Sequence, residues 1–124
     1  MNTQRGSALV MLLVITSVCM IVIVTTLSMM LITTENSYRI SRQREAQMVA
    51  ESGIENALVT LLRNPEYTGE ILTIDSGTAT ITVIEDGGVA TITSVGVVDT
   101  LQSRIVVEAD TSSGAVQVIS WQEQ

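Results

Sequence analysis

The sequence predicts an α+β protein in which one long N-terminal helix, membrane-spanning in its first half, packs at its C-terminal half on a small antiparallel β-meander. Two observations predict this class. A helical pattern continues without a break to Asn64-Pro65, and short alternating segments separated by turn residues follow it. Of the 124 residues, no more than about 60 lie beyond the helix, which is near the lower limit for a domain that folds alone. We therefore expect one small head, residues 68–124.

The first half of the helix has the composition of a membrane span. From Ser7 to Thr34 the chain reads SALVMLLVITSVCMIVIVTTLSMMLITT, without a charged residue. A helix needs only about 20 apolar residues to cross the roughly 30 Å hydrocarbon core of a bilayer. We expect a transmembrane segment at about residues 8–32, preceded by a leader, residues 1–6, that ends in Arg5-Gly6. The leader lacks the cleavage signal that a secretory signal peptide carries after its apolar core, so the apolar segment is expected to be kept.

The helix is expected to run on beyond the membrane to Arg63. No Gly follows Thr34 before Gly53, and Pro65 is the only Pro of the chain, so nothing obliges the helix to end earlier. Residues at three- and four-residue spacing form an apolar stripe that needs a covering partner: Ala50, Ile54, Ala57, Leu58, Leu61 and Leu62. Ile40, Gln43 and Gln47 continue this stripe weakly toward the membrane. We expect Ile54, Leu58 and Leu61 to pack on the sheet of the head.

Five segments of the head alternate between apolar and polar residues, as strands with one buried face do: ILTID, TATITVIE, VATITSVGVV, SRIVVEAD and AVQVISW. Between them lie the turn sequences Ser76-Gly77, Asp86-Gly87-Gly88, Asp99-Thr100 and Ser112-Ser113-Gly114. Breaks this short join neighbouring strands as hairpins, so the predicted sheet is a meander. In the second segment we expect Ala79, Ile81 and Val83 to face the helix.

The composition argues against nucleic-acid binding and against catalysis. The net charge is −7 and there is no Lys, whereas phosphate binding needs a basic surface. There is no His, and the only cysteine, Cys19, lies in the apolar run, so most nucleophile and base pairs are absent and no disulfide can form within the chain. We expect no enzyme, no cofactor and no metal.

Two acidic or aromatic features of the head have an ordinary explanation and a functional alternative. Asp86-Gly87-Gly88 is typical of a hairpin turn, and the ligand spacing of a calcium loop is missing. Trp121 is interpreted as a core residue, with a binding anchor as the alternative.

The segments taken together resemble the type IV pilin-like proteins. The motifs are QRG before the apolar run, then a polar helix ending in QREAQMVAESGIENAL, then a small strand-rich head. The phrase AESGIENAL is similar to the end of the PilX-type amino-terminal segment of minor pilins and secretion pseudopilins. This likeness covers about the first 60 residues, and the head matches only in kind.

The resemblance implies processing and an orientation. In these families a prepilin peptidase cuts after the leader glycine on the cytoplasmic side, here Gly6, and methylates the new amino terminus, here Ser7. The head is then extracytoplasmic on a single-pass membrane protein. The positive-inside rule alone predicts the opposite, because Arg39, Arg42 and Arg44 follow the membrane segment.

One departure from the family concerns the fifth mature position, where major pilins have a Glu and this chain has Met11. That Glu is thought to pair with the amino terminus of a neighbouring subunit in the filament. A subunit without it leaves that buried charge unpaired, which favours a place at the tip or in priming over a scattered place in the shaft.

The resulting functional hypothesis is a structural minor pilin or pseudopilin of a type IV pilus or a type II secretion-like filament. It implies contacts with other pilin-like subunits, the prepilin peptidase, an inner-membrane assembly platform and membrane lipid. Pilus, cell adhesion, secretion and DNA uptake all stay open as the setting. The alternative is a bitopic membrane protein whose small extracytoplasmic head binds a ligand or partner.

Overall fold

The computed structural model describes residues 2–75 and 77–124, and its elements confirm the predicted α+β class. They are one helix and five strands: α1 Asn2–Arg63, β1 Ile71–Ile74, β2 Gly77–Asp86, β3 Val89–Val98, β4 Leu101–Asp110 and β5 Gln117–Glu123. The chain divides into two compact units, Met1–Arg39 and Ile40–Gln124. Met1 of the predicted leader and Ser76 of the predicted Ser76-Gly77 turn lie outside the described residues.

The head contains a five-stranded antiparallel sheet in the order β1-β2-β3-β4-β5, which is the predicted meander. Gly87 and Gly88 have positive φ angles of 61° and 87° and form the turn between β2 and β3. Two successive residues of this kind give the turn whose twist matches a hairpin. Asp99 lies in the turn that joins β3 to β4 and has a φ of 53°, a conformation that Asp tolerates better than most residues.

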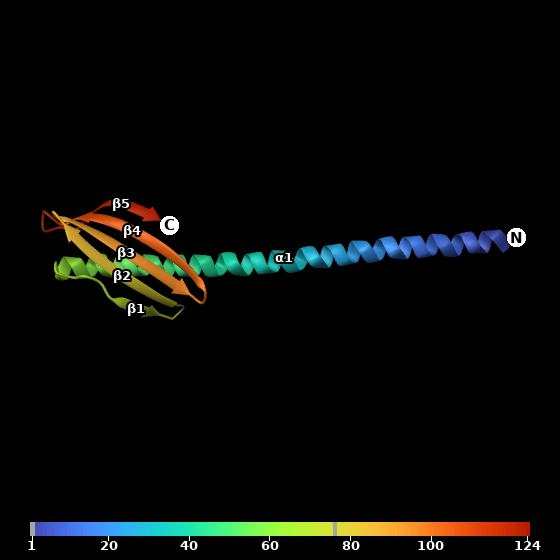
Figure 1. Ribbon diagram of the computed structural model, residues 1–124, viewed down its shortest axis with the longest axis horizontal. Helices are drawn as coiled ribbons and strands as arrows, with labels where there is room; N and C mark the ends of the chain where they lie inside the picture. Colours follow the sequence, from blue (N-terminus) through green and yellow to red (C-terminus); the bar gives the residue numbers. More distant parts are fainter. Residues whose placement is uncertain (1, 76) are drawn as a thin grey trace. The chain divides into compact units, whose positions relative to one another are not determined.

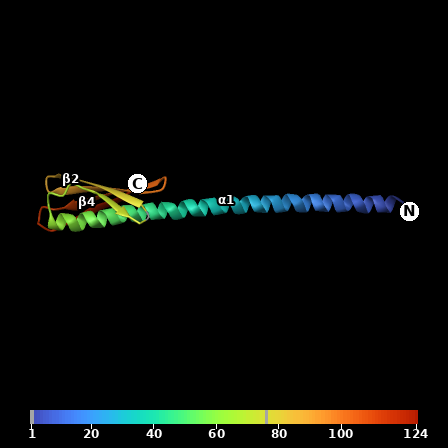
Figure 2. The same cartoon turned by 90° about the horizontal axis from the view of Figure 1, so that it is seen from below.

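The C-terminal part of α1 covers one face of this sheet (Figures 1 and 2). Burial alternates along β3 from Val89 to Val98, with every second side chain in the core. In β2 the predicted inward residues Ala79, Ile81 and Val83 are all buried. The sheet therefore has one covered face and one open face, as the alternation predicted.

The buried side of the helix carries small residues next to larger ones. The buried apolar residues of α1 are Ala46, Val49, Ala50, Ile54, Ala57 and Leu61. They pack mainly on β2, β3 and β4, through Ile81, Val83, Ala90, Ile92, Ile105 and Val107 in the larger core cluster. Leu58 is partly buried and packs against the same cluster. Ile54, Leu58 and Leu61 thus pack on the head as predicted.

The predicted stripe was wrong at Leu62 and at Ile40, whereas Gln43 and Gln47 hydrogen-bond to Gln102 and Glu123 of the head. Leu62 is 59% exposed, because it lies in the last turn of α1 beside the β4–β5 connection, which covers only part of its side chain. Toward the N-terminus of α1 the stripe continues through Ala46 and Val49 rather than through Ile40, which is 56% exposed. Alanine contributes little to an apolar pattern, which is why this shift was not visible in the sequence.

Close approach of the helix to the sheet depends on two glycines. A Cβ on Gly96 of β3 would clash with the carbonyl oxygen of Ala46 and lie 2.6 Å from the Ala50 nitrogen. A Cβ on Gly53 of α1 would clash with Oγ of Ser94 and lie 3.0 Å from Cβ of Ala79. Larger residues at either position would push the helix away from the sheet.

The helix is joined to the sheet by a short, hydrogen-bonded connection. It ends at Arg63, as Asn64-Pro65 predicted, and the Asn64 side chain accepts a hydrogen bond from the backbone of Glu66 at 3.1 Å. The carboxylate of Glu70 then accepts hydrogen bonds from Asn56 at 2.6 Å and from the Tyr67 hydroxyl at 3.0 Å. These bonds fasten the connection to the side of the helix.

Candidate functional site

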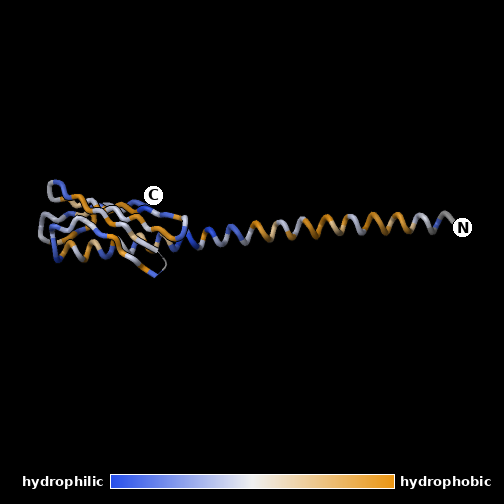
Figure 3. Tube along the Cα trace, turned by 60° about the horizontal axis from the view of Figure 1, so that its bottom comes forward, coloured by the Kyte–Doolittle hydropathy of each residue, from blue (hydrophilic) through white to orange (hydrophobic). Residues whose placement is uncertain are grey.

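The apolar segment of α1 is the first feature that bears on function. In the unit Met1–Arg39, the large apolar side chains from Leu9 to Ile32 are exposed, and the orange stretch of Figure 3 follows them. The helix that contains them is long and apolar enough to span a membrane. Such a surface is stable in lipid and is strongly disfavoured in water.

The polar residues of this segment are also suited to lipid. Hydroxyl groups donate hydrogen bonds of 2.6–2.9 Å to the carbonyl oxygens four residues earlier, from Thr16, Ser17, Thr25, Thr26, Ser28, Thr33 and Thr34. An unsatisfied hydroxyl in hydrocarbon costs several kcal/mol, and bonding within the helix removes that cost.

The predicted processing residues lie on this helix. Gly6 and Ser7 are exposed, and a Cβ on Gly6 would meet nothing within 4 Å. Met11 is 68% exposed. The helix begins at Asn2, before the predicted start at residue 7, so Gly6 lies within it. Glycine weakens a helix by about 1 kcal/mol relative to alanine, which makes this position easier to unwind.

Two ionisable groups of the head, Tyr67 and Asp110, have pKa values shifted by contacts within the head. Burial raises the pKa of Tyr67 to about 12, and the hydrogen bond to Glu70 and that carboxylate's charge act in the same direction. Hydrogen bonds from Ser112 lower the pKa of Asp110. Within residues 2–75 and 77–124, no group of His, Cys, Asp or Glu is placed to hold a metal ion.

Arg42 of α1 contacts the turn between β3 and β4. Its guanidinium lies 2.7 Å from Oε2 of Glu45 and 3.7 Å from Oδ2 of Asp99. One of the three arginines after the membrane segment is therefore held by acidic groups of the head.

No family model, curated protein or solved structure matches the chain.

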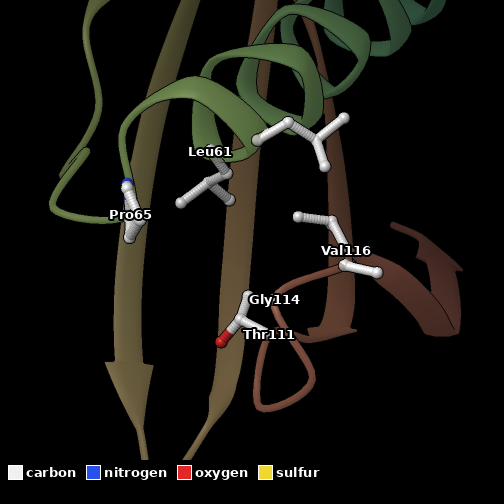
Figure 4. A pocket seen from close by; sticks show the side chains of 7 residues that line it. Leu61, Pro65, Thr111, Gly114 and Val116 are labelled. Carbon is white, nitrogen blue, oxygen red and sulfur yellow. The ribbon is translucent and has the colours of Figure 1, made fainter.

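The head has a small hollow at the end of the helix (Figure 4). It measures about 60 Å³ and is lined by Leu61, Leu62, Pro65, Thr111, Gly114, Ala115 and Val116. Small-molecule sites usually enclose about 300–1,000 Å³. This hollow is too small for such a ligand, and its lining is largely apolar.

The interpretation of Trp121 as a core residue was wrong. Its side chain is 43% exposed on β5, which is an edge strand. A register shift between Glu108 and Ala109 leaves Ile119 without a partner on β4, so the side chains of β5 do not alternate like those of the other strands. The neighbouring apolar pair Val118-Ile119 was the sequence signal for this bulge.

Proposed function

We propose that this chain is a structural minor subunit of a pilin-like filament, either a type IV pilus or a secretion-like filament. The observation that carries the proposal is that one helix, α1, supplies both an exposed apolar segment and the buried stripe of a compact head. An apolar helix of this kind can pass from lipid to contact with like helices, while the head remains folded.

Processing is the second part of the proposal. A prepilin peptidase removes the leader after Gly6 and methylates Ser7, while an inner-membrane assembly platform moves the subunit into the filament. The exposed Gly6, with open space around its Cα, suits a narrow subsite that accepts only a residue without a side chain. The head lies outside the cytoplasm in this proposal. The positive-inside rule opposes this orientation through Arg39, Arg42 and Arg44, and the acidic partners of Arg42 do not remove that conflict, because acidic residues count little in the rule.

The place in the filament follows from Met11. A thioether cannot neutralise the amino terminus of a neighbouring subunit, so a copy in the shaft would leave that charge uncompensated in an apolar environment. We propose a position at the tip or a role in priming assembly.

Intact-mass measurement of the membrane-extracted protein tests the processing. In a host with a prepilin peptidase, the chain should begin at methylated Ser7. A Gly6→Val variant, which adds a branched side chain at the cut, should keep its leader. If the unaltered chain retains its leader in that host, the filament proposal is wrong, and the bitopic protein with a binding head takes its place.

A further inference from the structure

Part of the helix-covered face of the sheet is bare. Val118 and Trp121 of β5 pair with Ala109 and Val107 of β4, and both partners are fully buried. Residues directly opposite each other in an antiparallel pair project from the same face, so Val118 and Trp121 are on the helix side. They are nevertheless 45% and 43% exposed, because α1 does not reach over β5. We call Val118, Trp121 and the exposed Leu62 of α1 the β5 shelf.

The shelf has an acidic rim at the C-terminal end of β5. The Gln47 amide donates hydrogen bonds to Oε1 of Glu51 at 3.3 Å and to Oε2 of Glu123 at 3.0 Å. The indole of Trp121 donates to the other oxygen of Glu123 at 3.4 Å. Within the described part of the chain, the side-chain ion pairs are those of Arg42, so Glu51 and Glu123 have no cationic partner there.

A complementary surface lies on the helix of the same unit. Ile40, Arg44 and Met48 follow one another at four-residue spacing, which puts them on one face of α1. Ile40 is 56% and Met48 64% exposed, and Arg44 is exposed between them without an ion pair among the described residues. On this face the basic Arg44 lies next to the apolar Met48, as on β5 the acidic Glu123 lies next to Trp121. The two surfaces therefore pair an apolar side chain with charges of opposite sign.

We propose that the Ile40–Arg44–Met48 face of a second copy of this chain docks on the β5 shelf. Its helix lies on the sheet beside α1, about 8–10 Å from it, as helices that pack side by side do. Met48 contacts Trp121 and Val118, and Arg44 binds between Glu51 and Glu123 against the indole ring. The Gln47 amide already donates a hydrogen bond to each carboxylate, and a guanidinium adds the positive charge that this neutral amide lacks.

The contact uses different surfaces on the two copies, so it is heterologous and staggers one copy along the other. The interface is small, so it forms only where copies are concentrated. It deepens the proposed filament role, and it joins heads without replacing the charge pair that Met11 lacks, so it gives a pair or a short run of copies.

Disulfide cross-linking between two tagged full-length chains in detergent micelles tests the contact. Both chains carry Cys19→Ser; one carries Met48→Cys and the other Val118→Cys, so a mixed-tag dimer can only join two copies. The matched control replaces Val118→Cys by Ile84→Cys, at a 65% exposed position on the open face of the sheet. We expect the mixed dimer to exceed the control. Equal yields, or no mixed dimer, would overturn the proposal.

Charge reversal tests the role of Arg44. Arg44→Glu in the Met48→Cys chain should lower the yield about fivefold, the effect of losing one exposed ion pair, and Glu51→Arg in the other chain should restore it. Arg63→Glu, at the end of α1, should change nothing. If Arg44→Glu does not fold, Arg44→Gln serves instead. Loss of the leader is measured separately, by intact mass. If the chain loses its leader but gives no selective cross-link, the contact between copies is refuted and the filament proposal is not.

Discussion

Ser94 and Gly96 lie two residues apart on the buried face of β3, and they meet the helix in opposite ways. Gly96 leaves room for the backbone of Ala46 and Ala50, whereas Ser94 places a hydroxyl against Gly53. Among the residues that the structure describes, that hydroxyl has no hydrogen-bond partner. A buried unpaired hydroxyl destabilises a fold, so this position carries a cost that the close packing of the two glycines offsets.

Gly96→Ala should destabilise the head by about 1–3 kcal/mol, because its Cβ overlaps the helix backbone, which cannot rotate away. Urea unfolding in mild detergent, followed by the fluorescence of Trp121, measures the change. Ser94→Ala on the same strand is the matched control: it removes the unpaired hydroxyl and should leave stability unchanged or raise it. A Gly96→Ala variant as stable as the unaltered chain would show that helix and sheet are less closely packed.

The raised pKa of Tyr67 predicts that the head loses stability at alkaline pH. Its pKa is about 12 in the folded head and 10 when unfolded, so below pH 10 both states keep the proton and its contribution is complete. Between pH 10 and 12 the unfolded state loses the proton first, and stability falls as the pH rises. The urea midpoint of the unaltered chain should fall more over this range than that of Tyr67→Phe. Parallel pH profiles would contradict the burial of this phenol.

At the scale of elements, the sheet depends on the helix for its covered face. Without α1, the buried side chains of β2, β3 and β4 would face water, among them Ile81, Ile92 and Ile105. A fragment starting at Thr34 should therefore unfold cooperatively, whereas one starting at Glu66 should not fold. Circular dichroism during heating distinguishes the two. A cooperative transition in the shorter fragment would refute the packing scheme.

Within the helix, burial sets the cost of truncation. Ile54 is fully buried and Leu58 only partly. Ile54→Ala should cost about 2–5 kcal/mol, and Leu58→Ala less, because its site is already open to solvent on one side. Urea unfolding of both variants gives the comparison. A larger loss for Leu58→Ala would mean that the β5 side of the helix is better covered than the structure has it.

The elements were predictable from the sequence because each carried a local signal. Alternation and glycine turns predicted the five strands and their order, and Asn64-Pro65 predicted the end of the helix. Gly53 and Gly96 gave no such signal, since a close approach of two backbones depends on tertiary packing and not on an apolar pattern. The exposed Trp121 was missed for a related reason: the width of the sheet relative to one helix decides whether an edge strand is covered.

For the whole molecule, Met11 predicts a low copy number. A subunit without the carboxylate should be a minor component near a filament end and should not form a shaft alone. Met11→Glu should increase its incorporation along the shaft, because the amino terminus of the next subunit then finds a partner. Immunogold labelling of sheared filaments measures this, with Met11→Gln as the uncharged control. Dense, regular labelling by the unaltered protein would contradict the tip position.

The order of elements along the chain also sets a delay during synthesis. The buried stripe around Ile54 leaves the ribosome first, and Ile105 and Val107 of β4, which complete its core, follow about 50 residues later. At a synthesis rate of about 5–20 residues per second, the stripe is complete roughly 3–10 s before those strands are made. During that interval the helix exposes an apolar face, and β3 has an unpaired edge. Newly made chains, rather than finished ones, are thus the form most exposed to aggregation and to proteases.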